Sequence, residues 1–582
     1  MLKLIKKIKR REGQMILLAA ALVLAGVWFD LTLPDYMTDL TRLINTPGSA
    51  IGDIWLTGLK MLGCTVASAL VSICVGYLSA RSGAGFAHTL RGDLFNHVTD
   101  LSPAEMHDFS VASLITRTTN DVTQVQMVIT MGLQTMIKAP VMAVWAILKI
   151  LGKSRELSLV TAGFIAAIAC LVAVVIFVVV PRFRLVQKLV DTINGVAREN
   201  LSGIHVVHAF NAEGYQQEKF EQPNTKLMKT QLFNQRVFAA LQPMMGLAMN
   251  GLSLTIFWLG AALLNQASMM QRLTLFADIV VFSTYAMYVV MSFMMLIVIF
   301  MILPQAQVSA ERINQVLNRK PSVVQGAVST AKEKGTVEFK NVSFRYPGAQ
   351  EDTLHDISFR AAKGETVAII GATGSGKTSL IGLIPRFYDA TQGEVLVDGV
   401  NVRDYAFDTL YDRLGYITQK AVLFSDTIRG NVLFGESAAA QNDDAVSKAL
   451  QLAQAEDFVS AHEEGLDYVI AQSGRNVSGG QKQRLSIARA LARKPEILIF
   501  DDSFSALDYA TDARLRHGLA EQLAETTRII VAQRVSTIRH ADRILVLEDG
   551  RCVGQGTHEE LMASCPVYQE IARSQLSEKE LM

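Results

Sequence analysis

Long uncharged stretches dominate the first half of the chain. Residues 157–180 hold no charged side chain over 24 positions, which is enough helix to cross a hydrocarbon layer of about 30 Å at about 1.5 Å per residue. Three other stretches are also uncharged, and two are less pure. The six expected membrane spans are therefore 14–33, 61–80, 126–151, 157–180, 237–264 and 279–303.

The flanks of these stretches indicate a topology. The basic segment KLIKKIKRREG precedes the first span, and cytoplasmic flanks of membrane helices are enriched in lysine and arginine. No small-residue cleavage site follows, so a retained helix is favoured over a cleavable signal peptide. We expect a multi-pass protein of the cell membrane (plasma or inner membrane), with both termini in the cytoplasm.

Two long segments between the expected spans, 81–125 and 182–236, carry apolar residues at helical spacing. Unstructured loops of this length are uncommon. We therefore expect these segments to be extensions of the membrane helices into the cytoplasm.

Polar and polarizable side chains within the spans raise two open questions. Lys138 is the main charge in an expected span, where a charge at the bilayer centre is costly. The favoured interpretation places it near the inner interface, with its side chain reaching water; a counter-charge for a transported substrate is the alternative. Methionines are dense in the last two spans. They either pack the helices and contact lipid, or form a deformable surface for differently shaped substrates.

Overall composition agrees with a membrane protein. Half of the residues are apolar and the mean hydropathy is +0.26, whereas 55 Lys and Arg nearly balance 54 Asp and Glu. No global field therefore favours a nucleic-acid partner. The five cysteines form no CxxC pair, which is typical of inert free thiols.

A glycine-rich motif, GATGSGKT at 371–378, follows the strand-like ETVAII and precedes the helical TSLIGLI. This context predicts a phosphate-binding loop. Backbone N–H groups of the loop and the following helix N-terminus would converge on the phosphates of ATP. Lys377 would reach the β- and γ-phosphates, and the Thr378 hydroxyl would bind Mg²⁺. The remaining loop residues are Gly371, Ala372, Thr373, Gly374, Ser375 and Gly376.

A second motif, SGGQ, lies just upstream of the strand-like ILIFDD. Its residues are Ser478, Gly479, Gly480 and Gln481. The serine and the N–H groups at the start of a helix would form another anion site. One chain rarely needs two γ-phosphate sites of this kind, so each of two chains is expected to contribute one element to a shared nucleotide.

Over nearly its whole length the chain resembles an ABC exporter half-transporter. The resemblance implies a six-helix α transmembrane domain (type I/IV ABC exporter fold) fused to an α/β P-loop ABC nucleotide-binding domain. Two such domains close head to tail on two ATP molecules in that family. By resemblance, Tyr346 stacks on adenine, Gln419 senses Mg²⁺ and contacts the membrane helices, and Asp501 is the Walker B aspartate, a ligand of Mg²⁺. Residues 505–508, SALD, match the D-loop at the dimer interface.

The same resemblance assigns the cytoplasmic segments and the domain limits. Residues 107–122 and 210–220 are similar to the two coupling segments that transmit closure of the ATP dimer, the second reaching the partner's domain. The expected domains are 1–320 (transmembrane, with long cytoplasmic extensions), 321–335 (a polar linker), 336–575 (nucleotide-binding) and 576–582 (a C-terminal tail).

Three positions depart from the family pattern. Asp502 stands where the family has a glutamate that polarises the attacking water, and displacements of about 1 Å can cost on the order of 100-fold in rate. Gln533 replaces the switch histidine and cannot take up a proton near neutral pH. Gln472 replaces an acidic residue before the signature. The chain's own site is therefore expected to bind ATP and hydrolyse it poorly.

These departures resemble the degenerate half of heterodimeric ABC exporters, many of them multidrug transporters. The leading hypothesis is ATP-driven export of amphipathic drugs or lipids together with a second half-transporter, in contact with membrane lipid. Alternatives are a peptide or siderophore transporter, a homodimeric lipid or drug exporter, and a regulatory or channel-like protein gated by ATP.

Overall fold

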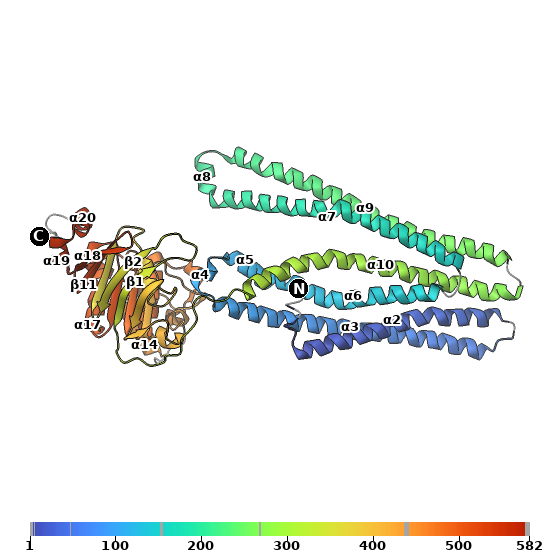
Figure 1. Cartoon of the computed structure of the whole chain (residues 1–582), viewed down its shortest axis with the longest axis horizontal. Helices are drawn as coiled ribbons and strands as arrows, with labels where there is room; N and C mark the ends of the chain where they lie inside the picture. Colours follow the sequence, from blue (N-terminus) through green and yellow to red (C-terminus); the bar gives the residue numbers. More distant parts are fainter. Residues whose placement is uncertain are drawn as a thin grey trace. The chain divides into compact units, whose positions relative to one another are not determined.

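The computed structural model describes residues 4, 6–46, 48–151, 155–266, 269–435 and 442–576. The chain forms two compact units. One comprises Met1–Val98 and Val111–Asn318, and the other Thr99–Ser110 and Arg319–Met582. Helices make up the first unit over its described residues, whereas sheets and helices form the second (Figure 1).

Six long helices build the first unit. They are α2 (Arg10–Asn45), α3 (Ile51–Thr99), α6 (Val122–Leu151), α7 (Arg155–Ser202), α9 (Glu213–Gln266) and α10 (Met269–Leu317). Among the described residues, six helical segments are long and apolar enough to cross a membrane, which confirms the number of spans expected from the sequence. Helices α3, α7 and α9 run for 49, 48 and 54 residues, so the long polar segments largely continue membrane helices, as predicted.

A buried apolar core joins five of these helices, to which α7 contributes Leu157 and Ile168. Val27 of α2, Ala146 of α6, Ile256 of α9 and Phe282 of α10 are all at most 1% exposed. Lipid tails are as apolar as these side chains, so the hydrophobic effect does not drive the helices together in a membrane. Close packing of side chains holds them instead. Helices α7 and α9 form a hairpin whose end carries α8 (Ile204–Ala209) (Figure 1).

The short helices lie close to the expected coupling segments. Helix α8 ends just before 210–220, and most of that segment already belongs to α9. Around the first expected segment, 107–122, the first unit has α5 (Val111–Thr116) and a π-helix, Arg117–Asp121. Helix α4 (Pro103–Met106) belongs to the second unit, where Glu105 Oε1 accepts a hydrogen bond of 3.2 Å from Ser322 N.

Lys138 has an acidic partner that the sequence reading did not identify. Its Nζ lies 2.9 Å from Asp30 Oδ2 of α2. This ion pair between helices adds an acidic partner that neither interpretation of Lys138 from the sequence included. Pairing lowers the cost of holding a charge in a membrane span.

The second unit is built on two sheets. The larger has six strands in the order β12-β11-β3-β10-β9-β6, all parallel except β12. The smaller has the order β2-β1-β4-β5 and is antiparallel. The strands are β1 (Val337–Phe344), β2 (Leu354–Ala361), β3 (Thr366–Gly371), β4 (Gln392–Val397), β5 (Val400–Asn401), β6 (Leu414–Ile417), β7 (Asp426–Thr427), β8 (Val469–Ile470), β9 (Ile497–Asp501), β10 (Thr527–Val531), β11 (Arg543–Glu548) and β12 (Arg551–Gly556).

Helices cover the larger sheet. They are α11 (Lys377–Gly382), α12 (Phe407–Arg413), α13 (Ile428–Val432), α14 (Asp443–Leu452), α15 (Glu456–Ser460), α16 (Gly479–Ala492), α17 (Tyr509–Gln522), α18 (Val535–Ile538), α19 (His558–Ser564) and α20 (Pro566–Gln575). The short strands β7 and β8 pair with each other beside α13.

The central strands are buried on both faces. In β3, Val367 and Ile369 belong to one apolar core, whereas Ala368 and Ile370 belong to the core on the other face. This alternation follows from the two-residue period of a strand, and a parallel sheet covered on both sides needs such continuous apolar runs.

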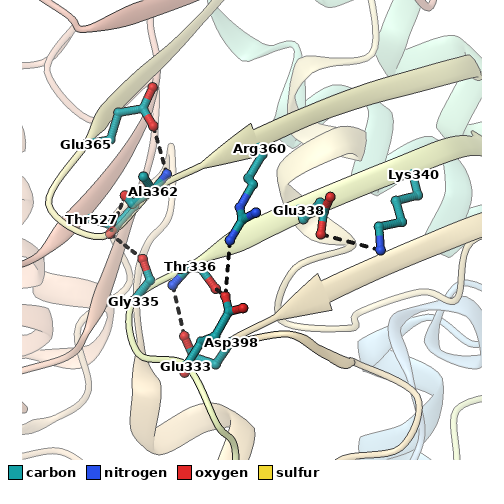
Figure 2. A network of polar contacts seen from close by, with 10 residues as sticks. All are labelled: Glu333, Gly335, Thr336, Glu338, Lys340, Arg360, Ala362, Glu365, Asp398 and Thr527. Carbon is teal, nitrogen blue, oxygen red and sulfur yellow. Dashed lines mark hydrogen bonds and ion pairs between the residues drawn. The ribbon is translucent and has the colours of Figure 1, made fainter.

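Polar contacts attach the end of the expected linker to the two sheets of the second unit (Figure 2). Thr336 N donates a hydrogen bond of 2.9 Å to Asp398 Oδ1, and Thr336 Oγ1 donates one of 2.9 Å to Glu333 Oε2. The buried hydroxyl of Thr527, at the start of β10, donates to the Gly335 carbonyl. These contacts join the linker to both sheets.

Candidate ATP site

The parallel strands bring the predicted site residues to one edge of the larger sheet. Val531 of β10 pairs with Ile369 of β3 and with Asp501 of β9, and Ile417 of β6 pairs with Phe500. The carboxyl ends of four strands therefore lie side by side. Loops at such an edge are where α/β sheets bind ligands.

The glycine-rich loop follows β3 and leads into α11. Gly374 and Gly376 have φ angles of 89° and 92°, a region that residues with a Cβ rarely adopt. A Cβ on Gly376 would also lie 2.7 Å from Leu354 Cδ2. Lys377 Nζ donates to the carbonyl oxygens of Gly371 at 2.9 Å and Ala372 at 2.7 Å, so the ammonium is held at the loop.

A threonine and an aspartate from different elements meet beside this loop. Thr378 Oγ1 donates a hydrogen bond of 2.9 Å to Asp501 Oδ1, and Tyr416 OH donates one of 3.4 Å to Asp501 Oδ2. Burial raises the pKa of Asp501. A hydroxyl and a carboxylate oxygen are donors that Mg²⁺ accepts together with phosphate oxygens and water, so these residues fit the ion that an ABC ATPase uses.

Two amides converge on one oxygen of the second aspartate. Asp502 Oδ2 accepts hydrogen bonds from Gln419 Nε2 at 3.2 Å and Gln533 Nε2 at 2.8 Å. Asp502 is 7% exposed, and burial raises the pKa of its carboxyl group. Its φ of 48° lies in the left-handed region, which aspartate tolerates better than most residues with a side chain. The structure thus links three residues to which sequence reasoning gave separate roles: Gln419 as the Mg²⁺ sensor, Gln533 at the switch position and Asp502 at the water-polarising position.

The C-terminal helix holds the loop that carries Gln533. Gln575 Nε2, at the end of α20, donates to the Gln533 carbonyl at 2.8 Å, and Gln575 Oε1 accepts from Val535 N at 2.9 Å. Sequence reasoning did not identify Gln575 or Tyr416. Tyr416 lies three residues before Gln419 in LGYITQ, whereas no local sequence pattern marks Gln575.

Tyr346, expected to stack on adenine, lies beside α11. Its hydroxyl is 2.8 Å from Ser379 Oγ. Its ring packs edge-on against Phe344 and Tyr388, with centroids 4.8 Å and 5.2 Å away. Tyr346 therefore contacts Ser379, the residue that directly follows the phosphate-binding motif.

The second motif caps α16. Ser478 Oγ accepts a hydrogen bond of 3.3 Å from Gln481 N, and Gln481 Oε1 accepts one of 2.8 Å from Ser478 N. This reciprocal capping box explains why serine and glutamine stand three residues apart. Gly479 is exposed in the first turn of the helix, where the macrodipole favours an anion. A Cβ on Gly480 would lie 3.4 Å from the carbonyl oxygen of Ala506, within the 505–508 segment.

The 505–508 segment is tied back to the second aspartate. Ser505 Oγ donates a hydrogen bond of 2.8 Å to the Asp502 carbonyl. Asp508 caps α17, its Oδ1 accepting from Thr511 N at 2.9 Å. Gln472 begins a short 3₁₀ turn, Gln472–Gly474, upstream of Ser478.

Family comparisons agree with this architecture. A family model described as "ABC transporter transmembrane region" matches residues 15–293, and one described as "ABC transporter" matches residues 354–505. The chain is 38% identical to an uncharacterized ABC transporter ATP-binding protein of Mycobacterium tuberculosis. The aligned 547 residues cover 93% of each chain.

The chain belongs to the ABC transporter family. It is an ABC exporter half-transporter, with a transmembrane domain fused to an ATP-binding domain. It is also 33% identical to an ATP-dependent lipid A-core flippase of Pseudomonas fluorescens, over 84% of this chain and 81% of the flippase. A solved structure of a bacterial Atm1-family ABC exporter with ATP bound shares the fold with a TM-score of 0.80, at 24% identity, covering 97% of this chain and 99% of the other. ABC ATPase domains use ATP and Mg²⁺, and ABC exporters function as dimers.

Proposed function

We propose that this chain is the subunit with the degenerate site in a heterodimeric ABC exporter of amphipathic drugs or lipids. It acts in the cell membrane, plasma or inner, with both termini in the cytoplasm. Its own ATP site binds nucleotide and hydrolyses it slowly, and its signature, Ser478 to Gln481, completes the hydrolytic site of a different half-transporter.

The observation that carries the proposal is the double amide contact on Asp502. A general base must reach the attacking water within hydrogen-bond distance. The carboxylate of Asp502 is one methylene shorter than that of glutamate, and Gln419 and Gln533 already donate to its Oδ2. Gln533 can hydrogen-bond to a phosphate oxygen but cannot transfer a proton near pH 7. Both groups that would assist hydrolysis are therefore weakened in the same site.

Binding groups, in contrast, are complete. Lys377, Thr378 and Asp501 hold the arrangement that a phosphate-binding loop needs for ATP with Mg²⁺. Tyr346 supplies an aromatic surface for adenine. In this proposal the site keeps nucleotide at the dimer interface, and the signature of the same chain stabilises the γ-phosphate in the partner's site.

The lipid or amphipathic cargo is supported by the long apolar helices and by the flippase relative, whose name specifies lipid A-core. Three methionines of the last two long helices, Met244, Met287 and Met291, have exposed side chains. Flexible thioether side chains adapt to differently shaped ligands.

Affinity purification from native membranes tests the heterodimer. A tag on this chain should recover a second half-transporter with glutamate after its Walker B aspartate and a switch histidine. Recovery of this chain alone as a dimer with rapid ATP turnover, unchanged by Asp502→Ala, would contradict the proposal.

Restoration of the missing groups tests the degenerate site. In the recovered complex, turnover by this chain's site should rise at least about tenfold in Asp502→Glu with Gln533→His, because correctly placed acid–base groups contribute about 10²–10⁴-fold. The same double variant with Lys377→Ala is the control and should lose the gain, since that lysine binds the nucleotide phosphates.

A further inference from the structure

The side-chain amide of Gln575 binds the main chain of the loop between β10 and α18 at two points. Gln575 Nε2 donates a hydrogen bond of 2.8 Å to the Gln533 carbonyl oxygen, and Gln575 Oε1 accepts one of 2.9 Å from Val535 N. Both ends of the amide are therefore used, one on each side of Arg534. A donor and an acceptor on one planar group fix the position and the orientation of residues 533–535 together.

Gln575 is the last residue of α20, and this helix is anchored by its buried face. Tyr568 and Ala572 of α20 are fully buried, and the Tyr568 hydroxyl lies 2.7 Å from His558 Nδ1 of α19. Gln575 itself is exposed, so its side chain adds little to the apolar core. Its two hydrogen bonds reach the loop from a packed helix, an arrangement that keeps site residues in place.

Two side chains of this loop contact the rest of the ATP site. Gln533 Nε2 donates to Asp502 Oδ2 at 2.8 Å. Arg534 Nη2 donates a hydrogen bond of 3.4 Å to the carbonyl oxygen of Ser505, in the 505–508 segment. The loop that Gln575 binds is therefore in contact with both the water-polarising position and the segment expected at the dimer interface.

The amide of Gln533 lies near the phosphate-binding lysine. Burial raises the pKa of the Asp502 carboxyl group, and the nearby charge of Lys377 acts against this rise. The amide nitrogen of Gln533 carries two N–H donors, one of which serves Asp502. The other can donate to an oxygen of the γ-phosphate, a group that ATP has and ADP lacks.

We propose that Gln575 is a positioning residue of the ATP site, which strengthens the binding of ATP over ADP by holding Gln533 toward the γ-phosphate. This inference rests on the ATP site of the proposed function, but it applies to a homodimer as well as to a heterodimer. A hydrogen bond is lost when its donor moves away by about 1 Å. Without Gln575 the loop loses two of the hydrogen bonds that set its position.

Nucleotide binding to the full-length transporter tests this role. Azido-ATP is photo-crosslinked to this subunit on ice with Mg²⁺, and unlabelled ATP or ADP competes, which gives an apparent Kd for each nucleotide. In Gln575→Ala we expect the Kd for ATP to rise about fivefold, which corresponds to about 1 kcal/mol, the usual net contribution of one hydrogen bond. The Kd for ADP should not change, because ADP lacks the group that Gln533 binds.

Gln569→Ala is the matched control. Gln569 lies on the same helix, and its Nε2 donates to the Met562 carbonyl of α19 at 2.8 Å, so this variant should keep the parent's ratio of the two Kd values. Because Gln575 is exposed, the Tm of Gln575→Ala should stay close to that of the parent. Equal weakening of ATP and ADP binding in Gln575→Ala would show a merely structural role and overturn the proposal.

The double variant Gln533→Ala with Gln575→Ala shows whether Gln575 acts through Gln533. ATP binding should be no weaker in the double variant than in Gln533→Ala alone, because the residue that Gln575 positions is then absent. A full further loss of ATP affinity in the double variant would contradict the proposal.

The same measurements separate this inference from the proposed function. If the parent subunit does not crosslink azido-ATP, the proposed function fails, and the inference fails with it. If the parent binds ATP but Gln533→Ala binds both nucleotides as the parent does, Gln533 does not reach the γ-phosphate and the inference alone is wrong. If Gln533→Ala weakens ATP binding while Gln575→Ala does not, the role given to Gln575 is wrong.

Discussion

Gln533 Nε2 donates a hydrogen bond of 2.8 Å to Asp502 Oδ2. The two residues follow the ends of neighbouring strands, β10 and β9. In the proposed function they replace the switch histidine and the water-polarising glutamate. Their contact means that the two substitutions form one interacting unit. A restoring variant must therefore change both positions, because histidine alone would still face a short carboxylate.

The ionised carboxylate of Asp502 should lower the stability of the folded protein, and the pH dependence of Tm should show this. Burial raises the pKa of its carboxyl group above the usual 3.8, so the folded protein binds this proton more tightly than the unfolded chain. Its contribution to stability is therefore favourable only at low pH and is lost as the pH rises through 3.8 and then through the raised folded pKa. Without nucleotide at pH 7, Asp502→Asn should raise Tm by a small amount, on the order of 2 °C.

Differential scanning fluorimetry of parent and variant from pH 4 to pH 8 measures this effect. The difference in Tm should shrink toward pH 4, where the parent carboxyl group becomes protonated. A lower Tm for Asp502→Asn at pH 7 would show that the amide contacts stabilise the carboxylate by more than burial costs.

Substitution of Ser478 should affect the partner's site more than this chain's own site. Ser478→Ala removes the hydroxyl that caps α16, at a cost of about 1 kcal/mol, and removes a donor for the partner's nucleotide. In the proposed heterodimer we expect ATP turnover to fall about tenfold or more, while ATP binding to this chain's phosphate loop is retained.

Ser460→Ala is a suitable control, because in the described part of the chain the Ser460 hydroxyl bonds to carbonyl groups of its own helix, those of Glu456 and Asp457. Turnover and photo-crosslinking of labelled ATP to each subunit give the two readouts. Equal loss of ATP binding in both subunits after Ser478→Ala would argue against a role confined to the partner's site.

Thr527 should be a large contributor to the stability of the ATP-binding unit. Its side chain is fully buried and accepts a hydrogen bond of 3.0 Å from Gly364 N. Its single hydroxyl proton is shared between the carbonyl oxygens of Gly335 and Ala362 (Figure 2). Thr527→Val keeps the shape but leaves the Gly364 N–H and two carbonyl groups without this partner. An unsatisfied buried group costs about 1–3 kcal/mol.

All four tryptophans lie in the first unit, so fluorescence would not report on the second. Pulse proteolysis of the full-length protein across a urea series, with cleavage within residues 319–582 followed by mass spectrometry, measures this loss for the unit. Thr336→Val is the matched control, since its hydroxyl bonds Glu333 at a more exposed position, and it should change stability by much less. Equal effects of the two valine variants would contradict the importance assigned to burial at Thr527.

The sequence predicted the elements whose chemistry is local. Six apolar stretches indicated six spans because the length of an uncharged run is itself the physical requirement for crossing a membrane. The phosphate loop was recognisable because its glycines, Lys377 and Thr378 are contiguous, and the capping box of Ser478 and Gln481 needs only a three-residue spacing. The departures at Asp502 and Gln533 were also visible as residue types.

Tertiary structure alone decided how these positions act on one another. The convergence of Gln419 and Gln533 on Asp502 depends on the parallel register of β6, β9 and β10, which no local pattern encodes. Gln575 holds the Gln533 loop from a helix near the end of the chain, and Asp30 pairs with Lys138 across two membrane helices. Hydrogen bonds and ion pairs between distant segments depend on packing geometry at the scale of ångströms, whereas a one-dimensional pattern carries only residue type and spacing.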